Sequence, residues 1–104
     1  MQTSKLEKDK YLTEILKALN YRNETEAAVD FTILSISTRY AEFVDECQRY
    51  EKKYGIEYKE FEKKISSKEN EEDFEEEDDL MAWKFAKEGA EFWLNKLEEL
   101  KSAL

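Results

Sequence analysis

The fold is decided by residues 23–55, NETEAAVDFTILSISTRYAEFVDECQRYEKKYG, a run with no proline and no glycine before its last position. Asn23 is a favourable N-cap, because its side-chain oxygen can accept a hydrogen bond from a first-turn N–H. Glu26 stands three residues later, where it can reach back in a capping box. Gly55 can adopt the left-handed conformation that ends a helix. The run therefore predicts one long helix over residues 24–54.

The composition indicates a small helical protein. The 104 residues include no proline and two glycines, and 41% of them are charged; this balance favours helices over tight turns. The length fits a single helical domain over residues 1–104. Cys47 is the only cysteine, which excludes an internal disulfide and indicates a reducing compartment. No apolar run approaches the roughly 20 residues of a membrane span, and we expect a cytoplasmic protein without a membrane partner.

The net charge of −9 is concentrated in the second half of the chain. Residues 1–52 carry 8 Lys/Arg and 10 Asp/Glu, a net of −2, whereas residues 53–104 carry 9 and 16, a net of −7. An acidic surface repels phosphate backbones, which argues against nucleic-acid binding. A basic protein is the natural partner, although acidity also serves solubility.

The N-terminal segment predicts a first helix over residues 5–19. Its apolar positions follow the i, i+3, i+4, i+7 spacing of one buried stripe; they are Leu12, Ile15, Leu16 and Leu19. Residues 20–22 form a connector short enough to join antiparallel or crossed helices. With the long helix, this segment predicts an all-α fold built on an antiparallel helical hairpin.

The C-terminal half predicts two more helices separated by an acidic linker. Tyr58, Phe61 and Ile65 mark a short third helix over residues 57–66. Residues 67–77 are predicted to form the linker, which charge repulsion should keep extended. A heptad stripe then predicts a long fourth helix over residues 78–103; the stripe consists of Trp83, Ala86, Ala90, Trp93, Leu97, Leu100 and Leu104.

Two segments carry more apolar surface than one small chain can easily bury. The long helix is apolar on almost every face between Ala27 and Ile36, so it must be buried all round. A four-helix monomer could only just surround it, and a homodimer would do so more easily. We expect dimer contacts at Phe31, Ile33, Leu34 and Ile36.

The fourth predicted helix is apolar on two opposed faces. Its heptad face can pack against the protein's own core, and the opposite face needs a second copy or a partner. Gly89 lies on that opposite face, where it would allow another chain to approach closely. The predicted partner-binding residues are Phe74, Asp78, Asp79, Met81, Phe85 and Phe92.

No residue pattern indicates catalysis. The chain has no histidine, and Cys47 lies on the apolar stripe of the long helix without a base to activate it. We therefore predict no enzyme, no catalytic residue and no cofactor. A metal in the acidic run 69–79 is the least favoured reading of that run, behind a solvated linker and a docking strap for a basic partner. The aromatic residues favour a core over a ligand pocket.

The first of two family resemblances lies in residues 11–36, YLTEILKALNYRNETEAAVDFTILSI. They resemble the two helices of ribbon-helix-helix antitoxins and repressors, with residues 23–27 at the capped start of the second helix. Residues 1–10 lack the basic alternating strand with which those proteins read DNA. An autoregulatory DNA-binding repressor is therefore an alternative and not the main expectation.

The second resemblance spans YGIEYKEFEKKI (residues 54–65) and FEEEDDLMAWKFA (residues 74–86). This pattern is similar to a group of small prokaryotic antitoxin-like proteins encoded beside small toxins. The matching positions are Tyr54, Gly55, Tyr58, Phe61, Phe74, Asp78, Met81 and Trp83. The resemblance implies that the chain binds and neutralises a cognate toxin by direct contact, and the acidity of the chain indicates that this toxin is basic. A structural or adaptor homodimer with no toxin partner is the other alternative.

Overall fold

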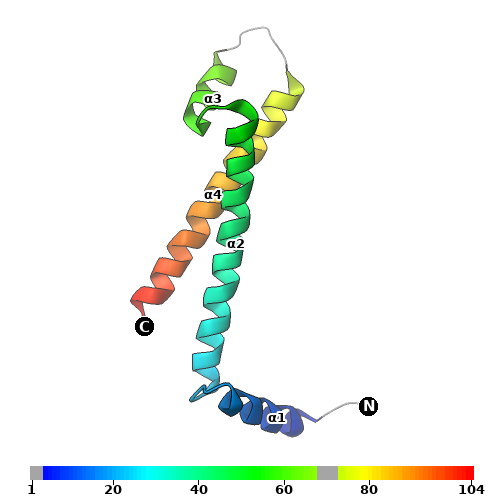
Figure 1. The fold of residues 1–104 in the computed structure, drawn as a ribbon, viewed down its shortest axis with the longest axis vertical. Coiled ribbons are helices and arrows are strands. Elements are labelled where there is room, and N and C mark those ends of the chain that lie inside the picture. The colour runs from blue at the N-terminus through cyan, green and yellow to red at the C-terminus, as the bar shows by residue number, and fades with distance from the viewer. Residues whose placement is uncertain (1–3, 68–72) are drawn as a thin grey trace. The chain divides into compact units, whose positions relative to one another are not determined.

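The computed structural model describes residues 4–67 and 73–104, and the regular elements within these ranges are all helices. They are α1 (Lys5–Ala18), α2 (Glu24–Tyr54), α3 (Tyr58–Ser66) and α4 (Phe74–Ser102), shown in Figure 1. The predicted all-α fold class, with its long second and fourth helices, is confirmed. The contacts divide the chain into two compact units, Met1–Ser35 and Ile36–Leu104; the single domain stays a prediction.

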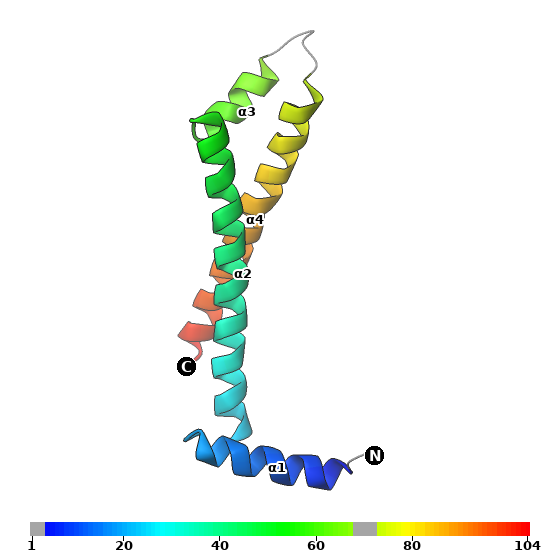
Figure 2. The same ribbon diagram turned by 45° about the vertical axis from the view of Figure 1, so that its right-hand side comes forward.

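Within the Met1–Ser35 unit, α1 ends in a turn that changes the direction of the chain before α2 begins. Asn20 has a φ of +67°, and its N–H donates to the Lys17 carbonyl at 3.0 Å, while the Tyr21 N–H donates to the Leu16 carbonyl at 2.9 Å. This pair of hydrogen bonds is a Schellman ending. As a result α1 crosses the start of α2 and does not run back along it (Figures 1 and 2), which corrects the predicted antiparallel hairpin.

The long helix α2 has the predicted bounds, and both of its ends are fixed as the sequence indicates. At its start, the Asn23 side-chain oxygen accepts the Glu26 N–H at 2.9 Å. The Glu26 carboxylate reaches back one residue further than a capping box requires, to the Arg22 N–H at 3.4 Å. At its end, Gly55 has a φ of +68°, and its N–H donates to the Glu51 carbonyl at 2.7 Å. Glycine suits this conformation because it has no Cβ to clash.

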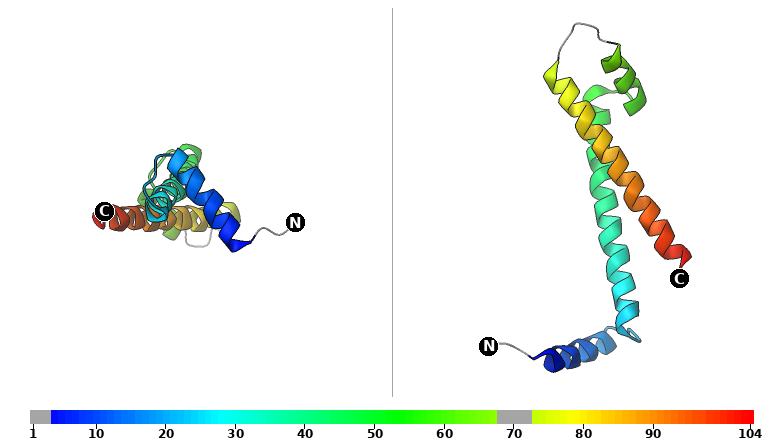
Figure 3. Two further views of the ribbon diagram at one scale, coloured as in Figure 1. Left: turned by 90° about the horizontal axis from the view of Figure 1, so that it is seen from below. Right: turned by 180° about the vertical axis from the view of Figure 1, so that it is seen from behind.

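The Ile36–Leu104 unit contains the core of the structure. Here α4 runs antiparallel to residues 36–54 of α2, and α3 packs on the first half of α4 (Figures 1 and 3). Trp83 (1% exposed) and Phe61 (0%) are the largest fully buried side chains. The Trp83 ring lies 5.8 Å from Tyr50, 5.6 Å from Tyr58 and 5.6 Å from Phe61, measured between ring centroids. These aromatic residues therefore form a core joining three helices, as expected.

Helix α4 begins four residues earlier than predicted, at Phe74 and not at Asp78. The Asp73 side chain accepts the Glu76 N–H at 3.2 Å and caps the helix. The carboxylates of the first turn interact favourably with the N-terminal end of the helix dipole, and this attraction offsets the repulsion from which we predicted an extended segment. Of the predicted acidic linker, residues 68–72 lie outside the described residues.

Gly89 allows a close approach, but within the chain itself. A Cβ added at Gly89 would lie 2.8 Å from two ring carbons of Phe43 on α2. Real Cβ atoms keep greater distances from their neighbours, so a side chain here would force the Phe43 ring or the two helices to shift. The prediction that this glycine admits another chain is therefore corrected: it admits α2.

Gly89→Leu is expected to destabilise the Ile36–Leu104 unit by about 1–3 kcal/mol through overpacking, although leucine is the better helix former by about 1 kcal/mol. Urea unfolding followed by circular dichroism measures this change. Asn95→Leu, at an exposed position of the same helix, is the matched control and should change stability little. Equal effects of the two substitutions would contradict the close-packing account of Gly89.

Candidate partner-binding surface

One face of α4 carries a row of exposed apolar and acidic side chains. Its members are spaced by three, four or seven residues, which places them in one line along the helix; they are Phe74, Asp78, Met81, Phe85, Glu88 and Phe92, here called the outer stripe. Met81 is 72% exposed and Phe85 is 66% exposed. Several large exposed apolar side chains on one face, with charged residues among them, are typical of an interaction site. Five of the six predicted partner-binding residues lie on it.

Two aromatic rings of the outer stripe, Phe85 and Phe92, contact other side chains of the same unit. The Phe85 ring meets Phe43 edge-on, with the ring centroids 5.7 Å apart. The Phe92 ring meets Trp93 edge-on at 5.0 Å, and the Lys96 ammonium lies 5.5 Å from the Phe92 centroid. Side chains that are already ordered lose less conformational entropy when a partner binds. The outer stripe is thus partly preorganised for binding.

A groove between α3 and α4 adjoins the outer stripe. Met81 and Leu80 form one wall, and Tyr58 and Glu62 form the other. Both apolar and charged side chains line the groove, as is common at interfaces. It offers a recess beside the exposed Met81, into which a side chain of a partner could insert.

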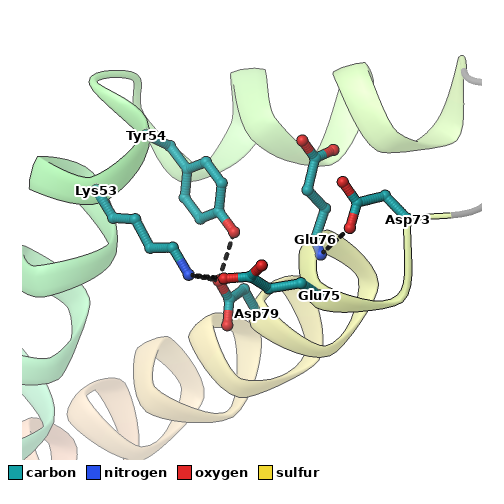
Figure 4. A network of polar contacts seen from close by, with 6 residues as sticks. All are labelled: Lys53, Tyr54, Asp73, Glu75, Glu76 and Asp79. Carbon is teal, nitrogen blue, oxygen red and sulfur yellow. Dashed lines mark hydrogen bonds and ion pairs between the residues drawn. The ribbon is translucent and has the colours of Figure 1, made fainter.

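Asp79, the sixth predicted partner-binding residue, does not lie on the outer stripe. It follows Asp78 by one residue, which turns its side chain about 100° around the helix. One Asp79 carboxylate oxygen accepts hydrogen bonds from the Lys53 ammonium, at 2.6 Å, and from the Tyr54 hydroxyl (Figure 4). Lys53 also donates to Glu75 at 2.7 Å. The Asp79 side chain is only 17% exposed, so it fastens α4 to the end of α2 and is not free to bind a partner.

The titration of this network follows from its geometry. Burial opposes ionisation of Asp79, but the hydrogen bonds from Lys53 and Tyr54 outweigh it and lower the pKa of the carboxyl below its ordinary value. Burial, and then the hydrogen bond to Asp79, raise the pKa of Tyr54 to about 12. Hydrogen bonds to Asp79 and Glu75 raise the pKa of Lys53. At neutral pH the network is therefore a carboxylate held by an ammonium and a neutral hydroxyl.

Asp79→Asn is expected to lower the free energy of unfolding at neutral pH by about 1–2 kcal/mol, because it removes a charge-assisted hydrogen bond. The folded-state pKa of Asp79 is depressed, so its contribution is present above the unfolded-state pKa of about 4 and is lost as the pH falls below that value. Urea unfolding across a pH series should show the wild-type advantage shrinking in acid.

Asp78→Asn is the matched control for this prediction, since Asp78 is the exposed neighbour of Asp79 on the same helix. A surface substitution of this kind should change stability by less than about 0.5 kcal/mol. If Asp78→Asn and Asp79→Asn had the same effect at neutral pH, the Asp79 network would not stabilise the fold.

The predicted dimer residues on α2 divide into two groups. Phe31 and Leu34 are exposed and Ile33 is half-buried, all within the Met1–Ser35 unit. Ile36 is only 7% exposed and belongs to the core of the other unit. Ile36 is therefore a core residue of its own chain, which corrects its assignment to a dimer contact.

Sequence reasoning missed the network of Lys53, Tyr54, Glu75 and Asp79. A signal for it was present: Asp79 precedes Trp83 by four residues and Ala86 by seven, so the three side chains share one face of α4. Trp83 and Ala86 are both buried. A carboxylate on the core face of a helix needs a partner from the facing element, and here the end of α2 supplies it.

The remaining features that bear on function are metal binding, membrane spanning, the cysteine and similarity to known proteins. Within residues 4–67 and 73–104, no three acidic or cysteine side chains converge to hold a metal ion. None of the four described helices is both long enough and apolar enough to cross a bilayer. Cys47 is half-buried, and burial raises the pKa of its thiol. The chain matches no family model, no curated protein and no solved structure in the comparisons made.

Proposed function

We propose that this chain is an antitoxin-like protein-binding module that neutralises a cognate, basic protein toxin by direct contact. The outer stripe of α4 carries the proposal, because large apolar side chains and carboxylates share one exposed line along a helix. An amphipathic helix that lays such a face into a groove is a common mode of protein recognition. The resemblance of residues 54–65 and 74–86 to antitoxin-like proteins supports the same function.

The charge of the Ile36–Leu104 unit supports a basic partner. Residues 36–104 carry 12 Lys/Arg and 20 Asp/Glu, a net of −8. Long-range attraction of this kind accelerates encounter with a basic protein and disfavours acidic competitors. Five consecutive carboxylates, at residues 75–79, open α4 beside the outer stripe.

The mechanism that we propose is surface masking. Phe74, Met81, Phe85 and Phe92 would fill apolar recesses of the toxin. The exposed carboxylates of the outer stripe, Asp78 and Glu88, would pair with its lysine and arginine side chains. Buried aromatic and aliphatic anchors at the centre of an interface usually contribute most of the affinity. Neutralisation then follows from covering the toxin, and no group of this chain has to react. The proposal includes a homodimer, which the exposed Phe31 supports.

Co-expression with the product of the neighbouring gene tests this proposal. We expect a stable 1:1 complex that survives purification, and we expect cells to be rescued when the neighbouring product is toxic alone. A neighbouring product that neither co-purifies with this chain nor loses its toxicity would reject the antitoxin function. The acidic surface further predicts that the rate of association falls as salt is added.

A structural or adaptor homodimer without a toxin is the second candidate. The exposed apolar residues of the Met1–Ser35 unit favour it, because a second copy of the chain could cover them without any toxin. A monodisperse dimer that does not bind the product of the neighbouring gene would support this alternative. An autoregulatory repressor is tested by a gel shift with promoter DNA at low salt, where no shift at micromolar protein rejects it.

A further inference from the structure

The Met1–Ser35 unit has apolar side chains but no core. Among its described residues, 4–35, none is buried. Its large exposed apolar side chains are Leu6, Tyr11, Leu12, Ile15, Leu19, Phe31 and Leu34. A helix of 14 residues, the length of α1, is marginal in water unless an apolar face packs against something. The unit therefore needs a covering surface to hold its helices.

The α2 segment of the same unit does not provide that cover. The ending of α1 at Asn20, with its φ of +67°, turns the connector so that α1 crosses the start of α2 (Figures 1 and 2). The Tyr21 hydroxyl donates to the Asp30 carboxylate at 2.8 Å and braces this turn. The apolar stripe of α1 stays open as a result; Ile15, at its centre, is 57% exposed.

The charges of the unit suit a second copy of itself. Helix α1 carries 4 lysines and 3 acidic residues, a net of +1, whereas residues 24–35 carry 3 acidic residues and no basic one, a net of −3. The α1 of one copy is thus attracted to the start of α2 in another. Residues 1–35 have a net charge of only −1, against −8 for residues 36–104, so two copies repel least where their N-terminal units meet.

We infer that the Met1–Ser35 unit is a self-association module in which α1 of one copy covers Phe31 and the start of α2 of a second copy. The inference rests on the proposed homodimer and deepens it by adding the α1 stripe to the interface and by separating that interface from the outer stripe of α4. A stable interface takes about 20–30 residues from each side, so most of residues 4–35 would have to take part in it. The resulting dimer holds two open outer stripes, one for each toxin molecule.

Light scattering on the wild type and on the single variants Ile15→Glu, Phe31→Glu and Phe85→Glu tests the inference. The wild type should give twice the chain mass of 12.5 kDa at micromolar concentration. Ile15→Glu buries two carboxylates in each dimer and should raise its dissociation constant at least about tenfold, towards a single-chain mass. Phe85→Glu is the matched control, since Phe85 is similarly exposed but lies on the outer stripe, and it should keep the two-chain mass.

The outcomes separate this inference from the proposals on which it rests. A single-chain mass for the wild type overturns the inference and the homodimer together. A two-chain mass for Ile15→Glu and a single-chain mass for Phe85→Glu keep the dimer but overturn its placement. A two-chain mass for Ile15→Glu, Phe31→Glu and Phe85→Glu alike also overturns it. Near-ultraviolet circular dichroism, to which the buried Trp83 contributes, checks that each variant keeps the core. Binding of the neighbouring product is measured separately.

Discussion

Replacing Trp83 with alanine is expected to lower the free energy of unfolding of the Ile36–Leu104 unit by about 3–5 kcal/mol. Trp83 is 1% exposed and its ring contacts aromatic rings of both α2 and α3. Its removal leaves a cavity at the point where three helices meet, and the flat rings around it cannot collapse without losing their own contacts. Since small domains are stable by only about 5–15 kcal/mol, this variant should lose a large part of the stability of the unit.

Urea unfolding followed by far-ultraviolet circular dichroism measures this loss, and Trp93→Ala provides a matched control. Trp93 lies on the same helix but is only half-buried, and it meets the exposed ring of Phe92 at its edge. Its removal should cost clearly less than the removal of Trp83, about 1–2 kcal/mol. Equal losses for the two tryptophans would contradict a core centred on Trp83.

The combined substitution Met81→Glu and Phe85→Glu is expected to weaken binding of the proposed toxin at least about 100-fold. Each substitution replaces an apolar anchor by a carboxylate that would be desolvated in the complex without a designed partner. Isothermal titration of the purified toxin into the variant measures the change. Both side chains are largely exposed in the free chain, so unfolding by urea should show a fold of nearly unchanged stability.

Phe31→Glu is the matched control for toxin binding. Phe31 is the same residue type as Phe85 and is similarly exposed, at 70%, but it belongs to the other unit of the chain. It should leave the intrinsic affinity of each outer stripe within about threefold of the wild-type value, because distant sites act independently. If Phe31→Glu lost as much affinity as the α4 variant, the toxin site would include the Met1–Ser35 unit, and its placement on the outer stripe alone would be contradicted.

The sequence predicted those features of the fold that depend on local chemistry. Asn23 and Gly55 mark the ends of α2 because capping and left-handed conformations depend on one residue and its immediate neighbours. The exposed apolar row of α4 could be predicted in the same way, since the spacing of Met81, Phe85 and Phe92 places them on one side of any helix. These predictions do not depend on which helices pack against one another.

The features that the sequence did not predict depend on contacts between helices. Asp79 and Asp78 are adjacent acidic residues, and only the position of the end of α2 decides that Asp79 binds Lys53 while Asp78 stays exposed. Gly89 permits a close approach from any chain, and only the packing shows that the approaching residue is Phe43. The early start of α4 is the exception, because it was missed although it depends on local chemistry: the Asp73 cap and the balance between repulsion and the helix dipole.

The rate at which hydrogen peroxide oxidises Met81 tests the central claim most directly, because oxidation of methionine to its sulfoxide requires access to the sulfur. The outer stripe is claimed to be open in the protein alone and covered by its partner. Peptide mass spectrometry should show Met81 oxidising nearly as fast as free methionine in the protein alone, and at least about tenfold more slowly in the complex with the neighbouring gene product. Protection of Met81 in the protein alone, or equal rates with and without the partner, would contradict the account.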